Sequence, residues 1–153
     1  MDEQTKSRVT KTAHLLAYTS LAIAILYAIH VFVVIDDHVV KQMLSNSGQK
    51  PTDNAIGLIR NNLQFTGVMY VLANLAGIIA IWNKHTYLWW FMFAVFVAQV
   101  LYNLVNISSL FVAISDVKSP LNILPLSIAL LLSIIMAIYM LIVSIKRKST
   151  FNK

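Results

Sequence analysis

Residues 121–145 read LNILPLSIALLLSIIMAIYMLIVSI, a run of 25 residues without any Asp, Glu, Lys or Arg. A helix needs about 20 mostly apolar residues to cross a hydrocarbon layer of about 30 Å. Three further stretches are equally free of charge: residues 13–35, 63–82 and 87–114. Because backbone groups in lipid must be paired within the segment, runs of this length predict helices. We therefore expect an all-α, integral membrane bundle of four transmembrane helices.

The overall composition points to the same class of protein. Of 153 residues, 58% are hydrophobic and 12% are charged. Soluble domains are about 45–50% apolar and about 25% charged. The length fits a single domain, residues 1–153. The chain has no cysteine, which excludes disulfide frameworks, thiolate metal sites and cysteine nucleophiles.

Basic residues are divided unequally between the two sides of the membrane. With four spans, both ends of the chain and the connection at 83–86 share one side. That side carries eight of the twelve Lys and Arg residues and only Asp2 and Glu3 among the acids, a net charge of +6 against 0 outside. The positive-inside rule predicts that both termini are cytoplasmic, with localisation in the cytoplasmic (plasma) membrane. Topology thus explains the charge, so we expect a lipid bilayer and no nucleic acid as partner.

The external loop, residues 36–62, is the one long connection. Its first part places four apolar residues on one helical face: Val39, Val40, Met43 and Leu44. We therefore expect the first helix to project beyond the membrane to about Leu44. The sequence Asn46-Ser47-Gly48 predicts its end, and Pro51-Thr52-Asp53 predicts the start of the next helix.

Features near the other connections also have local signatures. Ser119 followed by Pro120 predicts a helix start, and Pro125 predicts a kink further into the same helix. The connection at 83–86 is so short that the second and third helices must be antiparallel neighbours. The aromatic residues around it are typical of an interfacial belt: Trp82, Tyr87, Trp89 and Trp90.

Two stripes of uncharged polar residues run along the second and third helices. The first contains Asn62, Thr66, Tyr70 and Asn74, and the second contains Gln99, Tyr102, Asn103 and Asn106. Spacings of three and four place each set on one helical face. Positions equidistant from the connection should face each other. This predicts three pairs: Asn62 with Asn106, Thr66 with Tyr102, and Tyr70 with Gln99.

Two interpretations of these stripes remain open. Polar side chains in lipid hydrogen-bond between helices, for about 0.6 kcal/mol each on average, which would make the stripes interhelical contacts. Alternatively they line a polar cavity or a translocation pathway. All 18 charged residues lie outside the four charge-free stretches. This argues against a carboxylate-driven antiporter, a pump or a voltage sensor.

No pattern of residues predicts catalysis or a bound metal. His-Glu-x-x-His, Gly-x-Ser-x-Gly and glycine-rich phosphate loops are all missing from the sequence. His30, Asp37 and His38 share a helical face, but the two histidines would lie about 12 Å apart along a helix, too far for one ion. Haem held by paired histidines has little support, since nothing places His14 opposite His85. We expect no metal, no cofactor and no enzymatic activity.

Three functions remain. The first is a protein that acts by binding a membrane partner or a peptide, as an accessory or immunity-type protein does, and the long external loop favours it. Such a partner is another membrane protein or a second copy of the chain. The second is a small pore or carrier that uses the polar stripes. The third is a membrane-bound enzyme or redox subunit, which is supported only by the scattered histidines.

Overall fold

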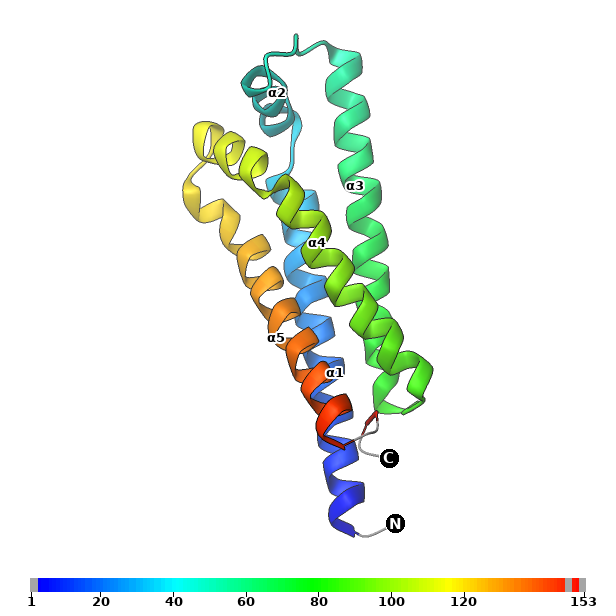
Figure 1. The fold of residues 1–153 in the computed structure, drawn as a ribbon. Helices are drawn as coiled ribbons and strands as arrows, with labels where there is room; N and C mark the ends of the chain where they lie inside the picture. The colour runs from blue at the N-terminus through cyan, green and yellow to red at the C-terminus, as the bar shows by residue number, and fades with distance from the viewer. Residues whose placement is uncertain (1–2, 148–149, 152–153) are drawn as a thin grey trace.

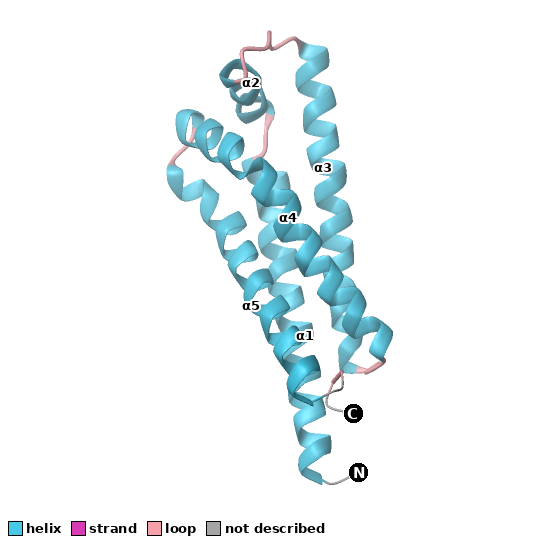
Figure 2. Cartoon of the chain, in the orientation of Figure 1, coloured by secondary structure: helices cyan, strands magenta, loops and turns pink. Residues whose placement is uncertain are grey.

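The computed structural model describes residues 3–147 and 150–151, which form helices and loops without a strand (Figure 2). In chain order the elements are α1 (Glu3–Ile29), the π-helical turn η1 (His30–Val34), α2 (Asp37–Asn46), α3 (Asp53–Leu75), the 3₁₀ segment η2 (Ala76–Ile81), α4 (Thr86–Val117), the 3₁₀ turn η3 (Pro120–Ile123) and α5 (Leu124–Arg147). The all-α prediction is confirmed for these residues.

Four helical stretches are long and apolar enough to cross a membrane: Lys6–Val34, Asp53–Ile81, Thr86–Val117 and Pro120–Lys146. Each overlaps one of the four predicted spans, and the second begins ten residues earlier than predicted. Together they form an elongated bundle in which the start of α1 and the end of α5 lie at the same end (Figure 1). The helix α1 packs against α3, η2 and α5, and α4 packs against α5. The architecture is that of a multi-pass membrane protein.

Two glycines allow η1 to approach α3 closely and α1 to approach η2 closely. A Cβ atom on Gly67 would collide with the side chain of Val31, and one on Gly77 would collide with Ser20 and approach Met92 to 2.9 Å. Since interiors are close-packed, these positions accept no side chain without displacement of a neighbour. Small residues have the same role at helix contacts in membranes generally.

The first helix ends earlier than predicted, and this part of the prediction is wrong. After the π-helical turn, Ile35 is extended (φ −83°, ψ 104°) and Asp36 starts the separate helix α2, with its Oδ1 accepting a hydrogen bond from the Val39 amide at 3.0 Å. A side chain that caps a new helix competes with continuation of the old one. The break also allows the apolar face of α2 to pack on the bundle, where Val39, Val40 and Leu44 are buried.

The predicted signals on either side of the following loop are confirmed. The helix α2 ends at Asn46, and Gly48 has a φ of +71°, a conformation that favours glycine. Thr52 caps α3, its hydroxyl accepting from the Ala55 amide at 3.3 Å. The α2 helix contacts both α3 and α4 and lies at the end where those two helices diverge (Figure 1).

Pro125 does not lie deep within a helix as predicted. The chain forms the 3₁₀ turn η3 after the Ser119 cap, and α5 begins only at Leu124. Pro125 therefore stands in the first turn of α5, where its missing N–H costs no helical hydrogen bond. The Ser119 cap itself is confirmed, because its Oγ accepts from the Leu121 amide at 3.4 Å.

The aromatic belt contains three exposed members and one residue that belongs to the core. Trp82, Tyr87 and Trp90 are 75%, 81% and 44% exposed, whereas Trp89 is fully buried. Its indole Nε1 donates to Ser144 Oγ at 3.0 Å, and its ring packs edge-on against Phe151, which is also buried. Phe151 thus covers Trp89 at this end of the bundle.

Candidate functional site

Polar side chains from α1, α3 and α4 meet inside the bundle. This interhelical polar cluster consists of Tyr27, His30, Tyr70, Asn74, Gln99, Tyr102 and Asn103. Four of its members are at most 2% exposed: His30, Asn74, Gln99 and Asn103. Burying an uncharged polar group costs free energy unless the group is hydrogen-bonded. The hydrogen-bond partners of these side chains therefore determine whether the cluster stabilises the bundle.

Five of the eight polar residues predicted from the stripes belong to this cluster: Tyr70, Asn74, Gln99, Tyr102 and Asn103. The other three do not. Asn62 is exposed in the first half of α3. Thr66 lies with Phe65 and Met69 in a groove on the surface of α3. The Asn106 amide donates back to a carbonyl of its own helix, that of Tyr102, at 2.9 Å.

Tyr27 and Asn103 link α1 to α4. The Tyr27 hydroxyl donates to Asn103 Oδ1 at 3.2 Å and accepts from Asn103 Nδ2 at 3.0 Å. The same Nδ2 donates to the Gln99 carbonyl at 2.7 Å. The Tyr27 ring also meets Tyr70 edge-on, with ring centroids 5.9 Å apart. Tyr27 therefore contacts both α3 and α4.

Asn74 and Gln99 link α3 to α4. Asn74 Nδ2 donates to Gln99 Oε1 at 2.8 Å and to the Tyr70 carbonyl at 2.8 Å. The Tyr70 hydroxyl donates to the Ala98 carbonyl at 3.2 Å, and its ring centroid lies 5.7 Å from that of Tyr102. These amide bonds are interhelical contacts of the kind that holds membrane bundles together.

The register of α3 against α4 differs from the predicted one by about one helical turn. Asn74 pairs with Gln99, and Tyr70 lies against Tyr102, instead of Tyr70 with Gln99 and Thr66 with Tyr102. Part of the difference comes from η2, because a 3₁₀ segment rises about 2.0 Å per residue against about 1.5 Å in an α-helix. Over its six residues this moves α3 outward by about 3 Å.

Tyr27 and His30 were not predicted as part of the cluster. Their spacing of three in an uncharged span places them on one helical face, and this signal was available in the sequence. The sequence pattern instead groups His30 with Asp37 and His38 further along the chain. In the structure His30 is buried beside Tyr27, with ring centroids 6.0 Å apart, while Asp37 and His38 are exposed on α2.

Three polar atoms of the cluster are buried and have no hydrogen-bond partner in the described part of the chain: His30 Nδ1, Asn74 Oδ1 and Gln99 Nε2. Each such atom costs about 1–3 kcal/mol relative to a paired one. His30 also begins the π-helical turn η1, a type of distortion that is frequent at functional sites. The cluster thus has a buried centre that is incompletely hydrogen-bonded, while Tyr70 and Tyr102 at its edge are partly exposed.

A second group of polar contacts fixes α2 at the end of the bundle opposite the two termini, which we call the outer end (Figure 1). Lys118 Nζ donates to the carbonyls of Val33 and Val34 at 3.2 and 2.9 Å and forms an ion pair with Asp36 at 2.8 Å. Burial raises the pKa of the Asp36 carboxyl, but hydrogen bonds from Lys118 and from the Val39 amide outweigh burial and hold this pKa below its usual value. Lys118 thereby joins the end of α1 to the start of α2.

Two further contacts hold the rest of α2. Arg60 Nη1 on α3 donates to both carboxylate oxygens of Asp37, at 2.8 and 2.9 Å. At the other end of α2, Gln42 and Asn46 both donate to Asp116 Oδ2 on α4, at 3.2 and 3.1 Å. We call α2 with these three groups of contacts the outer cap.

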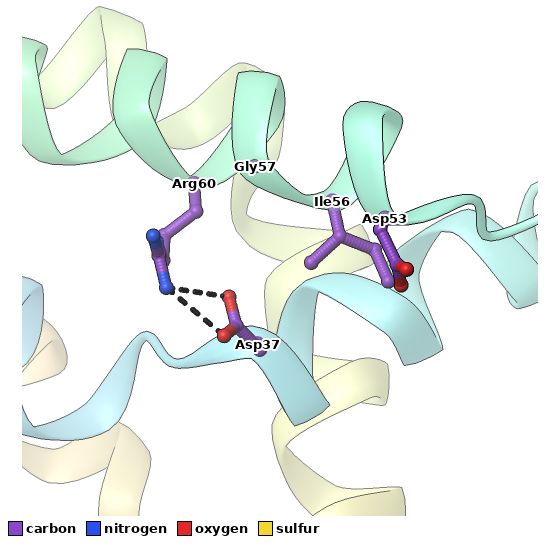
Figure 3. A pocket seen from close by; sticks show the side chains of 5 residues that line it. All are labelled: Asp37, Asp53, Ile56, Gly57 and Arg60. Carbon is purple, nitrogen blue, oxygen red and sulfur yellow. Dashed lines mark hydrogen bonds and ion pairs between the residues drawn. The ribbon is translucent and has the colours of Figure 1, made fainter.

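Between α2 and α3 the outer cap contains a cavity of about 280 Å³, the α2–α3 pocket. It is lined by Asp37, Asp53, Ile56, Gly57 and Arg60. Figure 3 shows the Arg60 guanidinium directed at Asp37, with Asp53 at the far end of the same α3 face and Ile56 between them. The pocket therefore presents the Arg60–Asp37 ion pair at one end and the unpaired carboxylate of Asp53 at the other.

Nothing in the described ranges gathers three or more His, Asp or Glu side chains in a position to hold a metal ion. Comparison of the sequence with protein-family models, and of the chain with curated proteins and solved structures, found no match. The function is therefore inferred from the geometry of the interhelical polar cluster and of the outer cap.

Proposed function

We propose that the chain is a non-enzymatic membrane protein that binds a membrane partner or a peptide, in the manner of an accessory or immunity-type protein. The observation that carries this proposal is the construction of the outer cap. The apolar face of α2 packs against the bundle. Polar contacts with α3, α4 and the α4–α5 loop hold this helix in place. A fixed external surface at residues 47–52 is thereby offered to a partner.

The interior supports the same proposal. Asn74, Gln99 and Asn103 are at most 2% exposed, and each takes part in an interhelical hydrogen bond. A water-filled lining would expose these side chains. The proposal includes location in the plasma membrane with cytoplasmic termini. The orientation is supported by the excess of Lys and Arg at the end of the bundle where the termini lie.

The test uses the cysteine-free chain, in which single cysteines can be introduced without background. Gln49→Cys in the external loop and Val105→Cys on the lipid-facing side of α4 each receive a photo-crosslinker in native membranes. We expect one discrete adduct from position 49 only. The same adduct from both positions, or none from position 49, contradicts binding at the outer cap. A membrane-impermeant maleimide that labels Gln49→Cys but not Lys84→Cys in intact cells checks the topology.

One observation favours a second function, a small pore or carrier. The three unpaired atoms of the interhelical polar cluster would be satisfied by a polar solute that enters between α1, α3 and α4. Flux of a small polar solute in liposomes, abolished by Asn103→Leu in a folded protein, supports this function. Proteoliposomes that are no more permeable than empty ones contradict it and leave the binding role.

A further inference from the structure

The α2–α3 pocket contains a guanidinium nitrogen and a carboxylate that have no partner among the described residues. Arg60 contacts Asp37 through Nη1 alone, so Nη2 donates to no group in the described part of the chain. Asp53 forms no ion pair or side-chain hydrogen bond with any described residue. Guanidinium and carboxylate groups are strong donors and acceptors, and both remain available to a ligand.

The two charges differ in their distance from the membrane. Arg60 precedes the charge-free stretch 63–82 by three residues, which places it about 5 Å beyond the hydrocarbon layer, at the depth of lipid headgroups. Asp53 lies two helical turns further out, about 10 Å along α3. Moving outward from the membrane, the pocket presents a cation and then an anion.

A phosphoethanolamine headgroup has the complementary order, with its phosphate near the hydrocarbon layer and its primary ammonium further out. We infer that the α2–α3 pocket binds the headgroup of a phosphatidylethanolamine lipid. Arg60 Nη2 donates to the phosphate, and Asp53 accepts from the ammonium. The short hydrocarbon link between the two charges lies over Ile56 and Gly57, where no neighbouring atom comes within 4 Å of an added Cβ.

The chemistry discriminates among lipids. A choline headgroup has the same phosphate but no N–H to donate to Asp53, and its methyl groups keep the cation away from the carboxylate. A glycerol headgroup lacks the cation and meets the carboxylates of Asp37 and Asp53 with a net negative charge. We expect dioleoyl phosphatidylethanolamine to bind about tenfold more tightly than the choline or glycerol lipid, the factor that one charge-assisted hydrogen bond provides.

The measurement is native mass spectrometry of the delipidated full chain, titrated separately with the three dioleoyl lipids. Asp53→Asn should reduce the ethanolamine preference to about twofold or less, because it removes the acceptor charge without breaking an ion pair of the protein. Glu3→Gln is the matched control. It removes the acid in the first turn of α1, at the opposite end of the bundle, and should retain the preference.

A second variant does not depend on charge. Gly57→Leu places a side chain in the pocket from a Cβ position that has no atom within 4 Å, and it increases the helix propensity of α3, so the variant should fold while losing the lipid. Retention of the tenfold preference by Gly57→Leu or by Asp53→Asn would overturn the inference, as would equal binding of the ethanolamine and choline lipids by the wild type.

A last arm of the titration identifies the source of the headgroup. Glycerophosphoethanolamine, which lacks the acyl chains, is offered to the same protein in detergent. Binding of the intact lipid at concentrations at which the soluble headgroup does not compete supports a membrane lipid as the ligand. Equal binding of the two overturns the lipid assignment and leaves a site for a free zwitterion. None of these results depends on a partner at the external loop.

Discussion

The interhelical polar cluster and the outer cap are both built from polar contacts between helices, but the environment differs. In the cluster, Asn74 and Gln99 have no exposed surface, so an amide that loses its partner has no water to replace it. In the outer cap, Arg60 and Asp37 expose 37% and 57% of their side chains and can return to water when separated. Similar contacts should therefore make unequal contributions to stability.

The comparison assigns different roles to the two regions. Close packing and buried amides in the cluster hold α1, α3 and α4 together. The outer cap is held mainly by burial of its apolar face, and its ion pairs set where α2 sits. Four variants test this assignment, in order of decreasing expected effect.

The largest effect is expected where α1 touches η2. Gly77→Leu has no space beside Ser20 and Met92 and should lower the free energy of unfolding by about 3 kcal/mol or prevent folding. Gly57→Leu is the matched substitution beside the outer cap, where an added Cβ has no atom within 4 Å, and it should cost much less stability. Denaturant titration in mild detergent, followed by circular dichroism, measures both. Equal losses for the two variants would remove the distinction between the regions.

Next in size is the loss of a buried amide. Asn74→Leu leaves Gln99 without the partner that it meets at 2.8 Å, and the free energy of unfolding should fall by about 1–2 kcal/mol. The double variant Asn74→Leu with Gln99→Leu should lose less than the sum of the single losses, since neither amide is then left unpaired. Additive losses from the two substitutions would show that the pair is not coupled.

A smaller effect is expected from pH at the outer cap. The pKa of Asp36 in the folded state lies below its unfolded value, so its contribution is complete above about pH 4 and is lost as the pH falls through the folded pKa. For an exposed ion pair the contribution is below about 1 kcal/mol. The midpoint of thermal unfolding is measured at pH 7, 5, 4 and 3 for the wild type and for Asp36→Asn. It should fall less with acid in the variant, because the contribution of the Asp36 carboxylate is already absent. An unchanged acid profile in that variant argues against the contact with Lys118.

The smallest effect belongs to Arg60 and Asp37. A double-mutant cycle with Arg60→Gln and Asp37→Asn should give a coupling free energy of about 0.2–1 kcal/mol, because both side chains are substantially exposed. The coupling should fall further in high salt. A value above about 2 kcal/mol would mean that the outer cap is as strongly held by ion pairs as the interior is by amides.

Features that depend on one short segment could be predicted from the sequence. The membrane spans follow from the runs without charge, and the helix boundaries at Gly48, Thr52 and Ser119 follow from backbone and capping chemistry local to each position. Features that need two distant segments could not. Trp89 is buried because Phe151 returns to cover it, and the first helix breaks where Lys118 from another loop meets its last carbonyls.

The candidate site shows the same division. The stripe on α4 was found from its spacing, and Gln99 and Asn103 are indeed buried together. Their actual partners depend on how three helices cross, and the 3₁₀ segment η2 shifts one of them. Tyr27 was therefore missed, although it is the residue that contacts both other helices of the cluster.

The hydrogen bonds between Tyr27 and Asn103 can form only some time after Tyr27 has been synthesised. The two residues are separated by 76 positions in the chain. At a translation rate of about 5–20 residues per second, about 4–15 s pass between their emergence from the ribosome. For that interval the newly inserted first span holds its phenol and imidazole in the bilayer without their native neighbours. The nascent protein thus has a period in which the insertion machinery, rather than the bundle, must shelter α1.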